Sequence, residues 1–302
     1  MKLFTLFLLI PYVQAIIKGT SIYGCETDNR NFVCSWVHPV EYYTEQLKKM
    51  GFNLLRFPFS YQYVVENNWQ SLDHGMEIAF QQNFSVVLDF HRTWNDRQQY
   101  SPTSDGVSLD QFISAWLTIL NRYQHYPNLI GGNSWNEFQG SNHQDILVYT
   151  LPLFDRIEQQ FPNRFQYYVT GSNWGGNISS LNEHFRHLPY YNRIYYSVHK
   201  YSWSGTADEA DWEYSFGNVG VPPDKIVVGE FGWMENKPEQ VEWAKRFIAY
   251  LKRKNIRNTI YWTIAHSVDT GNLYQDDCQI IKWDNYLLLR TLWEDRRYLR
   301  KG

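Results

Sequence analysis

Short runs rich in β-branched and aromatic residues alternate with longer amphipathic stretches along almost the whole chain. This alternation predicts repeated units of one strand and one helix, which assemble a parallel sheet. Eight such units can be laid down, so the predicted fold is α/β, a single (β/α)8 TIM barrel. The expected strands lie near residues 17–23, 53–58, 85–90, 131–136, 165–170, 194–199, 226–230 and 259–263. The expected helices lie near residues 41–50, 72–82, 108–125, 144–160, 179–187, 208–215, 239–254 and 281–292.

The first fifteen residues differ from the rest of the chain. Lys2 precedes an apolar run that is too short to span a bilayer, and Ala15 is a small residue at which a signal peptidase can cut. We therefore expect residues 1–15 to be a signal peptide and residues 16–302 to be one domain, secreted to the extracellular space without a membrane anchor. No Ser/Thr/Pro-rich linker marks a second domain.

Charge and metal-ligand spacing exclude several classes of partner. The formal net charge is −3 and the basic residues are mostly dispersed, so nucleic acid is a poor candidate. The three cysteines and nine histidines show no Cys-x-x-Cys or His-Glu-x-x-His spacing, so we expect no metal and no cofactor. We expect the chain to act as a monomer.

The cysteines predict one disulfide. Cys25 and Cys34 flank a polar stretch that can turn back on itself, and an oxidising compartment would let them pair. Cys278 would then remain as a buried free thiol.

Two glutamates end apolar, β-branched runs about ninety residues apart. Glu137 follows Asn136, and Glu230 follows the run that starts at Ile226. Buried strands need such apolar runs, whereas carboxylates emerge where a strand opens into a loop. Two glutamates that flank a glycosidic bond can divide the chemistry: one, protonated, assists the leaving oxygen, and the other, ionised, attacks the anomeric carbon.

Other polar and aromatic residues also end predicted strands. Because the ends of parallel strands meet on one face of a barrel, these side chains are expected to share that face with the glutamates. A single histidine or arginine in such a place is more often structural, but this many at different strand ends is hard to obtain from packing alone. The strand-end set is Arg56, Asp89, His91, Asn136, Glu137, His199, Tyr201, Glu230 and Trp262.

Seven short segments follow one another in a distinctive order and spacing: Gly24–Thr27, Gly51–Ser60, Val87–Arg92, Asn136–Glu137, Asn192–Tyr201, Gly229–Gly232 and Tyr261–Trp262. In this order and spacing they resemble glycoside hydrolase family five, and more closely its bacterial endo-β-1,4-glucanases. The resemblance covers nearly the whole chain after residue 15. An eighth region, Ser267–Asp277, is similar to an Asp-Thr-Gly-Gly…Asp-Asp stretch of the endoglucanase branch, although Asn272 replaces its second glycine. Phe138 replaces the proline that usually follows Asn-Glu.

The resemblance implies a role for each site residue. Glu137 would be the acid/base and Glu230 the nucleophile. Asn136 would bind the sugar 2-hydroxyl, and Tyr201 would lie against the nucleophile. Arg56 would keep Glu230 ionised. His91 and His199 would contact substrate hydroxyls and the carboxylates, and Trp262 would lie under the sugar next to the cleaved bond.

The leading hypothesis is therefore a secreted retaining endo-β-1,4-glucanase that acts on cellulose-type β-glucan. One alternative keeps the chemistry and changes the substrate to mannan, mixed-linkage glucan or β-1,3-glucan. The other is a non-catalytic glycan-binding protein on the same barrel. With no long insertion visible between the units, we expect a groove that is open at both ends, with Trp94, Trp174, Trp203 and Trp233 as candidates for stacking sugars along it.

Overall fold

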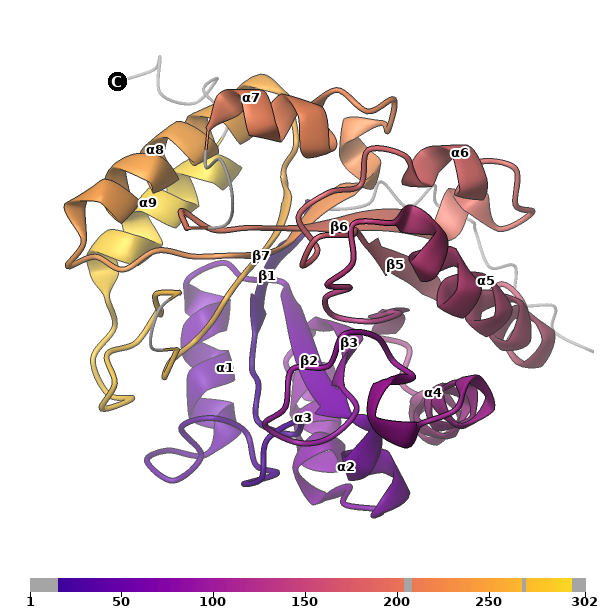
Figure 1. The fold of residues 1–302 in the computed structure, drawn as a ribbon. Coiled ribbons are helices and arrows are strands. Elements are labelled where there is room, and N and C mark those ends of the chain that lie inside the picture. Colours follow the sequence, from indigo (N-terminus) through magenta and orange to yellow (C-terminus); the bar gives the residue numbers. More distant parts are fainter. Residues whose placement is uncertain (1–15, 204–207, 268–269, 295–302) are drawn as a thin grey trace, which may run out of the picture.

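The structure, a computed structural model, describes residues 16–203, 208–267 and 270–294. Its strands form one closed barrel in which each strand pairs in parallel with its neighbours in sequence order, and β1 pairs with β8 to complete the ring (Figure 1). The prediction of a (β/α)8 barrel is confirmed. The strands are β1 Lys18–Ser21, β2 Leu54–Ser60, β3 Ser85–Arg92, β4 Leu129–Asn133, β5 Gln166–Thr170, β6 Ile194–Lys200, β7 Ile226–Phe231 and β8 Asn258–Tyr261.

Helices surround the barrel, and α8 and α9 lie side by side at one edge (Figure 1). Short 3-10 and π turns add to them at Ser104–Gly106, Tyr191–Arg193, Glu213–Gly217 and Pro223–Lys225. The α-helices are α1 Val40–Lys49, α2 Tyr61–Val65, α3 Gln70–Gln81, α4 Leu109–Tyr123, α5 His143–Gln160, α6 Leu181–Phe185, α7 Glu209–Trp212, α8 Pro238–Arg253 and α9 Trp283–Trp293.

Helix α4 illustrates how the sequence determines these elements. The Ser108 hydroxyl accepts from the Gln111 backbone N–H while the Gln111 side chain accepts from the Ser108 N–H, a reciprocal cap that stabilises a helix start by about 1 kcal/mol. Phe112, Trp116 and Ile119 then recur at helical spacing and are all buried. The helix therefore packs one apolar face against the barrel and leaves its polar face in solvent.

Two predicted helices are shorter than expected, and one was missed. Helix α6 ends at Phe185, and Pro189, which disfavours helical geometry in the residue before it, follows closely. Helix α7 ends at Trp212 and continues as a π-helical turn. The short helix α2, which starts directly after β2 under a Ser60 cap, was not predicted because one turn of helix gives no apolar periodicity.

A layer of apolar side chains fills the barrel interior near the N-terminal ends of the strands. Because side chains in a strand alternate between faces, residues two and four positions beyond this layer also point inward, nearer the C-terminal end. Arg56 follows Leu54 in this way, and His199 follows Tyr195. The polar strand-end residues therefore lie directly above this packed apolar layer. Its members are Ile17, Leu54, Val87, Tyr168, Tyr195, Val227 and Ile260.

The predicted disulfide pairing is wrong. Cys34 is bonded to Cys278, 244 residues away, with their Cα atoms 5.7 Å apart, and Cys25 is the buried free thiol. Cys25 pairs with Phe59 in an isolated bridge beside β2, so its side chain belongs to the packed core. Closure of the barrel brings the loop after β8 to the loop after β1, a contact that distance along the chain does not reveal.

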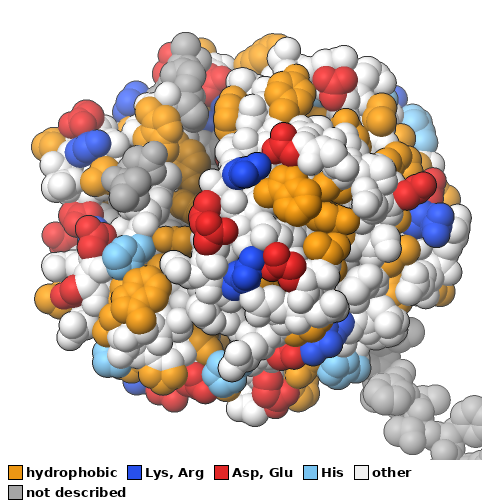
Figure 2. Space-filling model, turned by 60° about the horizontal axis from the view of Figure 1, so that its bottom comes forward, with side chains coloured by type: hydrophobic (Ala, Val, Ile, Leu, Met, Phe, Trp, Pro, Cys, Tyr) orange, Lys and Arg blue, Asp and Glu red, His pale blue; other side chains and the backbone are white. Residues whose placement is uncertain are grey.

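Two further features bear on the predicted partners. None of the helices in the described part of the chain is long and apolar enough to cross a membrane. On the face shown in Figure 2, acidic and basic side chains are intermingled, and neither sign forms a broad patch. The predicted signal peptide, residues 1–15, lies outside the described residues and stays a prediction.

Candidate active site

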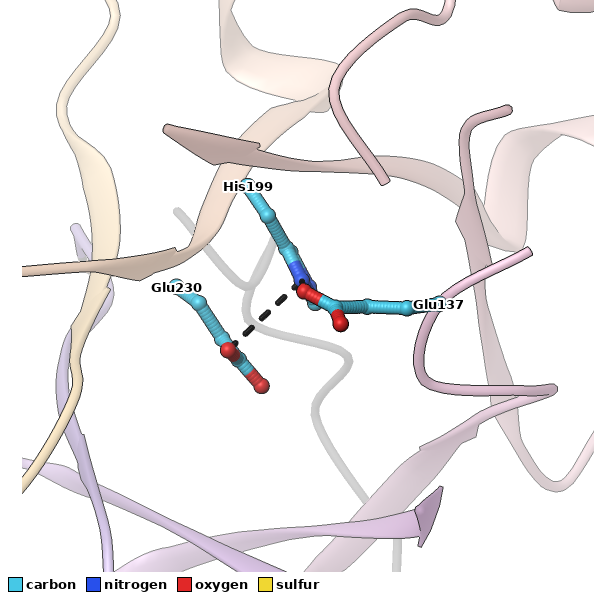
Figure 3. Close-up of side chains that lie close together, drawn as sticks. All are labelled: Glu137, His199 and Glu230. Carbon is cyan, nitrogen blue, oxygen red and sulfur yellow. Dashed lines mark hydrogen bonds and ion pairs between the residues drawn. The ribbon is translucent and has the colours of Figure 1, made fainter. Parts of the chain in front are cut away.

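Glu137 and Glu230 face each other at the C-terminal end of the barrel, with His199 between them (Figure 3). Glu230 is in β7, and Glu137 lies in the loop that follows β4. His199 Nδ1 lies 3.0 Å from Glu137 Oε1 and 3.7 Å from Glu230 Oε2. One ligand atom from each of the three side chains lies within 4.8 Å of the others, so the two carboxylates are close enough to act on one bond.

The loop that carries Glu137 is fixed by backbone hydrogen bonds to both neighbouring strands. The Ser134 N–H donates to the Tyr168 carbonyl (3.0 Å), and the Asn136 N–H donates to the Phe90 carbonyl (2.9 Å). Regular strand pairing of β4 stops at Asn133, three residues earlier than predicted. Asn136 is buried, whereas the Glu137 side chain is 16 % exposed and so reaches the cleft.

Arg56 is a buried cation directly behind Glu230 and Asn136. Its Nη1 lies 2.6 Å from Glu230 Oε1, and its Nη2 lies 2.9 Å from Asp89 Oδ1 and donates to Asn136 Oδ1 at 2.7 Å. A guanidinium stays protonated even when it is buried, and its planar fork suits several oxygen acceptors at once. Arg56 therefore compensates two buried carboxylates and fixes the Asn136 amide.

The surroundings of Glu230 keep its carboxyl group ionised. Burial alone would raise its pKa, but electrostatic interactions with His199, Arg56 and His91 outweigh burial and lower the pKa below its ordinary value of 4.5. The Tyr201 hydroxyl also donates to Glu230 Oε2 at 3.0 Å. Burial, followed by the negative charge of Glu230, raises the pKa of that phenol far above its usual range, so Tyr201 remains a neutral donor.

His91 and Asn136 are held by a chain of hydrogen bonds that starts at Asp89. Asp89 Oδ2 lies 2.6 Å from His91 Nδ1, and Asn136 Nδ2 lies 3.3 Å from His91 Nε2. Burial would raise the pKa of Asp89, but Arg56 and His91 lower it. Since Asp89 is an anion that accepts from Nδ1, His91 Nε2 is left to accept from the Asn136 amide.

Trp262 forms a flat wall beside these groups. Its ring stacks on His91, with the ring centroids 5.2 Å apart and the planes 12° from parallel. Its ring also stacks on Tyr23, with the ring centroids 5.6 Å apart, and the Arg56 guanidinium carbon lies 5.6 Å from its centroid. Trp262 is only partly buried, so part of its ring stays accessible.

These residues line a cleft of about 700 Å³. Seven of the eight predicted site residues lie on its surface, and Arg56 lies directly behind Glu230 and Asn136. The structure thus brings the whole predicted set together. The lining residues are His91, Arg92, Gln98, Asn136, Glu137, Asn173, Trp174, Gly176, His199, Lys200, Tyr201, Trp203, Asp211, Glu230, Trp262 and Thr270.

Comparison with known proteins agrees with this geometry. The family model described as Cellulase (glycosyl hydrolase family 5) matches residues 18–267. The chain belongs to glycosyl hydrolase family 5. It is 26 % identical over 318 residues to an endoglucanase of Paenibacillus polymyxa. This match covers 87 % of this chain and 79 % of that protein. It is also 25 % identical over 328 residues to the major extracellular endoglucanase of Xanthomonas campestris. That match covers 92 % of this chain and 67 % of that protein.

Solved structures share the fold. An endocellulase of Pyrococcus horikoshii, determined as a cellotetraose complex, superposes with a TM-score of 0.83 at 22 % identity and covers 93 % of both chains. The catalytic domain of the major endoglucanase of Xanthomonas campestris gives a TM-score of 0.81 at 23 % identity, with 92 % of this chain and 95 % of that domain covered. This family 5 chain therefore has the same barrel as those endocellulases.

The four tryptophans predicted to stack sugars divide into two groups. Trp174 and Trp203 are 47 % and 46 % exposed and line the cleft. Trp233 is 1 % exposed and packs against Tyr261, so the prediction is wrong for this residue. Trp94 is partly buried, donates from Nε1 to the Asp105 carbonyl, and lies outside the cleft lining.

Sequence reasoning missed several residues of this family 5 cleft. Asp89 was recognised as a strand-end residue but not as the group that orients His91 and Arg56. Gln98 lines the cleft, and its Nε2 lies 3.4 Å from Glu137 Oε2. The resemblance to family 5 covers Asp89, whereas Gln98 lies in a loop without a local pattern.

Among the described residues, Glu137, His199 and Glu230 form the one group of histidines and carboxylates close enough to hold a metal ion. Arg56 already lies 2.6 Å from Glu230 and supplies a positive charge there. These groups are also hydrogen-bonded to one another and to Tyr201. The arrangement fits a pair of catalytic carboxylates, and the expectation of no metal stays a prediction.

Proposed function

We propose that this family 5 protein is a secreted, retaining endo-β-1,4-glucanase that hydrolyses internal bonds of cellulose-type β-glucan. The observation that carries the proposal is the pair of carboxylates within 4.8 Å, with Glu230 held ionised by Arg56. Retaining glycosidases have their two carboxyl groups about 5–5.5 Å apart, which leaves no room for a water between nucleophile and sugar. The endoglucanase names of the relatives favour β-glucan as the substrate.

In the first step, Glu230 attacks the anomeric carbon while Glu137 protonates the glycosidic oxygen. The carbon–oxygen bond breaks, the shortened chain leaves as an alcohol, and an ester links the sugar to Glu230. In the second step, Glu137, now a carboxylate, removes a proton from water as that water attacks the same carbon. Glu230 is released as a carboxylate, and two inversions give net retention.

The surrounding residues assist by position and charge. Asn136, held by Arg56 and His91, is directed at the sugar 2-hydroxyl, where a hydrogen bond strengthens in the transition state. Trp262 supports the sugar at the reacting carbon through its exposed face. His199 contacts both carboxylates and is positioned to bind substrate hydroxyls.

A product profile tests this proposal. On carboxymethyl cellulose, an open groove predicts that viscosity falls steeply before many reducing ends appear, and cello-oligosaccharides should give several products. A panel of mannan, mixed-linkage glucan and β-1,3-glucan separates the alternative substrates. Binding to a glycan without release of any reducing ends would instead support the non-catalytic alternative.

Secretion has its own test. We infer that residues 1–15 are removed and that the mature protein is extracellular, as the name of the Xanthomonas relative states for that protein. N-terminal sequencing of protein recovered from the culture medium should begin at Ile16. Retention of Met1 in the purified protein would contradict the inference.

A further inference from the structure

A buried ion pair lies in the wall of the cleft. Lys200 Nζ lies 2.7 Å from Asp211 Oδ2, and both residues line the same cavity as Glu137 and Glu230. Lys200 is 4 % exposed, and the Asp211 side chain is 20 % exposed. Burying two charges costs free energy, so such a pair beside a substrate cleft needs a reason.

The backbone explains how Lys200 reaches this position. His199 and Tyr201, its neighbours in the sequence, both turn to the carboxylates, so Lys200 extends to the other face of β6. There it meets Asp211 of α7, and its Nζ lies 6.0 Å from the centroid of the Phe216 ring. Gly176 forms the adjoining wall: a Cβ at that position would lie 3.9 Å from Nζ.

The pair lies on the side of the cleft that adjoins Glu137. The Trp174 N–H donates to the carbonyl of Phe138, the residue after Glu137 (2.8 Å), and the His199 N–H donates to the Gly175 carbonyl (3.0 Å). These bonds attach the segment that contains Gly176 to the Glu137 loop. Under the proposed function, Trp262 would support the attacked sugar at the β8 side of the cleft, and the leaving unit, whose oxygen Glu137 would protonate, would then lie on the side of Lys200.

The charges of the pair indicate what it binds. Lys200 and Asp211 neutralise each other, so the site suits a neutral ligand better than an anion. The ammonium has three N–H donors, of which Asp211 Oδ2 uses one, and the carboxylate is an acceptor only. Of two adjacent hydroxyls of a sugar ring, one can accept from the ammonium while the other donates to the carboxylate, so this pair can bind both.

We propose that Lys200 and Asp211 bind neighbouring hydroxyls of the glucosyl unit that leaves in the first step, and so select a sugar leaving group over a hydroxyl-free one. The inference rests on the proposed glucanase function and adds two specificity-determining residues to it. Trp174 and Trp203, exposed beside the pair, would cover the apolar faces of the same unit.

The test compares two leaving groups in the full-length protein. Cellotetraose releases a sugar, whereas 4-nitrophenyl β-cellobioside releases a phenol that has no vicinal hydroxyls. In Lys200→Met and in Asp211→Asn, the ratio of kcat/KM for cellotetraose to kcat/KM for the aryl glycoside should fall by about 10–100-fold, as expected for hydrogen bonds to charged groups. The loss on cellotetraose should appear at least partly as a higher KM.

A double variant and a control keep the test decisive. Lys200→Met/Asp211→Leu removes both charges, so it leaves no unpaired buried ion and should fold while showing the same fall in ratio. Lys254→Met removes a lysine paired with Glu213 at 2.9 Å outside the cleft lining and should leave the ratio unchanged.

Two results would overturn the inference alone: equal losses on both substrates, which would mark the pair as structural, or no loss on either. Failure of the wild type to cleave any β-1,4-linked oligosaccharide would overturn the proposed function and the inference with it. That failure is visible before any variant is made, so the two outcomes are distinguishable.

Discussion

Arg56 Nη1 lies 2.6 Å from Glu230 Oε1, although 174 residues separate the two in the sequence. Both side chains are almost fully buried, at 2 % and 5 % exposed. In a site of low polarity this pairing is strong, and breaking it would leave an uncompensated buried carboxylate. The state of charge at Glu230 is thus set before any substrate binds.

Arg56→Met should shift the acidic limb of the pH profile. In the wild type, the lowered pKa of Glu230 places the acidic limb of kcat/KM below pH 4.5. Without the guanidinium, the pKa of Glu230 rises and the limb moves to higher pH. Arg56→Lys keeps a positive charge and should shift the limb less. A limb that stays in place in Arg56→Met would contradict this account of Glu230.

Stability should also fall in acid. Glu230 and Asp89 both have a folded-state pKa below the unfolded value, so each stabilises the native state fully above that value. The contribution of Glu230 is lost as the pH falls below 4.5, and that of Asp89 as it falls below 3.8, in each case through the folded-state pKa. Denaturant unfolding of the wild type should therefore show a falling free energy of unfolding over this range, and a smaller fall in Glu230→Gln. Identical pH dependence in the two proteins would count against the linkage.

Glu230→Gln should abolish turnover on every substrate, because an amide cannot form the glycosyl-enzyme ester. Glu137→Gln should lose most activity on cellotetraose but keep more on an aryl glycoside, whose phenol leaves without a proton. Steady-state kinetics on both substrates measures this, with Glu213→Gln, on the outer surface, as the matched control. Near-normal rates in Glu230→Gln would refute the assignment of the nucleophile.

Hydrolysis should retain the anomeric configuration. The short distance between Glu137 and Glu230 admits a covalent intermediate rather than a water between carboxylate and sugar. Proton NMR of the first product from cellotetraose should show the β-anomer before mutarotation. An initial α-anomer would exclude double displacement.

The disulfide should contribute strongly to stability. The Cys34–Cys278 bond closes a loop of 244 residues, for which the chain-entropy model gives about 5 kcal/mol. Cys34→Ala should lower the free energy of unfolding, whereas the control Cys25→Ala leaves the bond intact. Mass spectrometry without reduction should find one free thiol per chain, and a Cys25–Cys34 peptide would contradict the Cys34–Cys278 pairing.

The alternation of strand and helix patterns along the chain predicted the barrel, and the period of two within each strand placed several polar residues on one face of it. Side chains two residues apart point the same way in a strand, so Arg56, His91 and His199 could be placed on one face without knowing any tertiary contact. The cysteine pairing could not be predicted in this way, because Cys34 meets Cys278 only when the barrel closes.

The prediction for Trp233 failed for a related reason. Like Trp262, it follows the end of a strand, and only its packing against Phe231 and Tyr261 reveals that it belongs to the core. Asp211 lies on a helix of one turn that no motif marked, so its pairing with the buried Lys200 also depends on the tertiary fold.

The tight turn at Gly175 limits how this cleft can evolve. Gly175 has a φ of +73°, and a Cβ there would lie 2.9 Å from the His199 ring and from Thr170. Any other residue would have to displace the histidine that contacts both carboxylates. The backbone position of Trp174, the preceding residue, is therefore constrained together with the catalytic geometry. Changes in substrate preference then have to arise at exposed side chains such as Trp203, whose replacement leaves the backbone undisturbed.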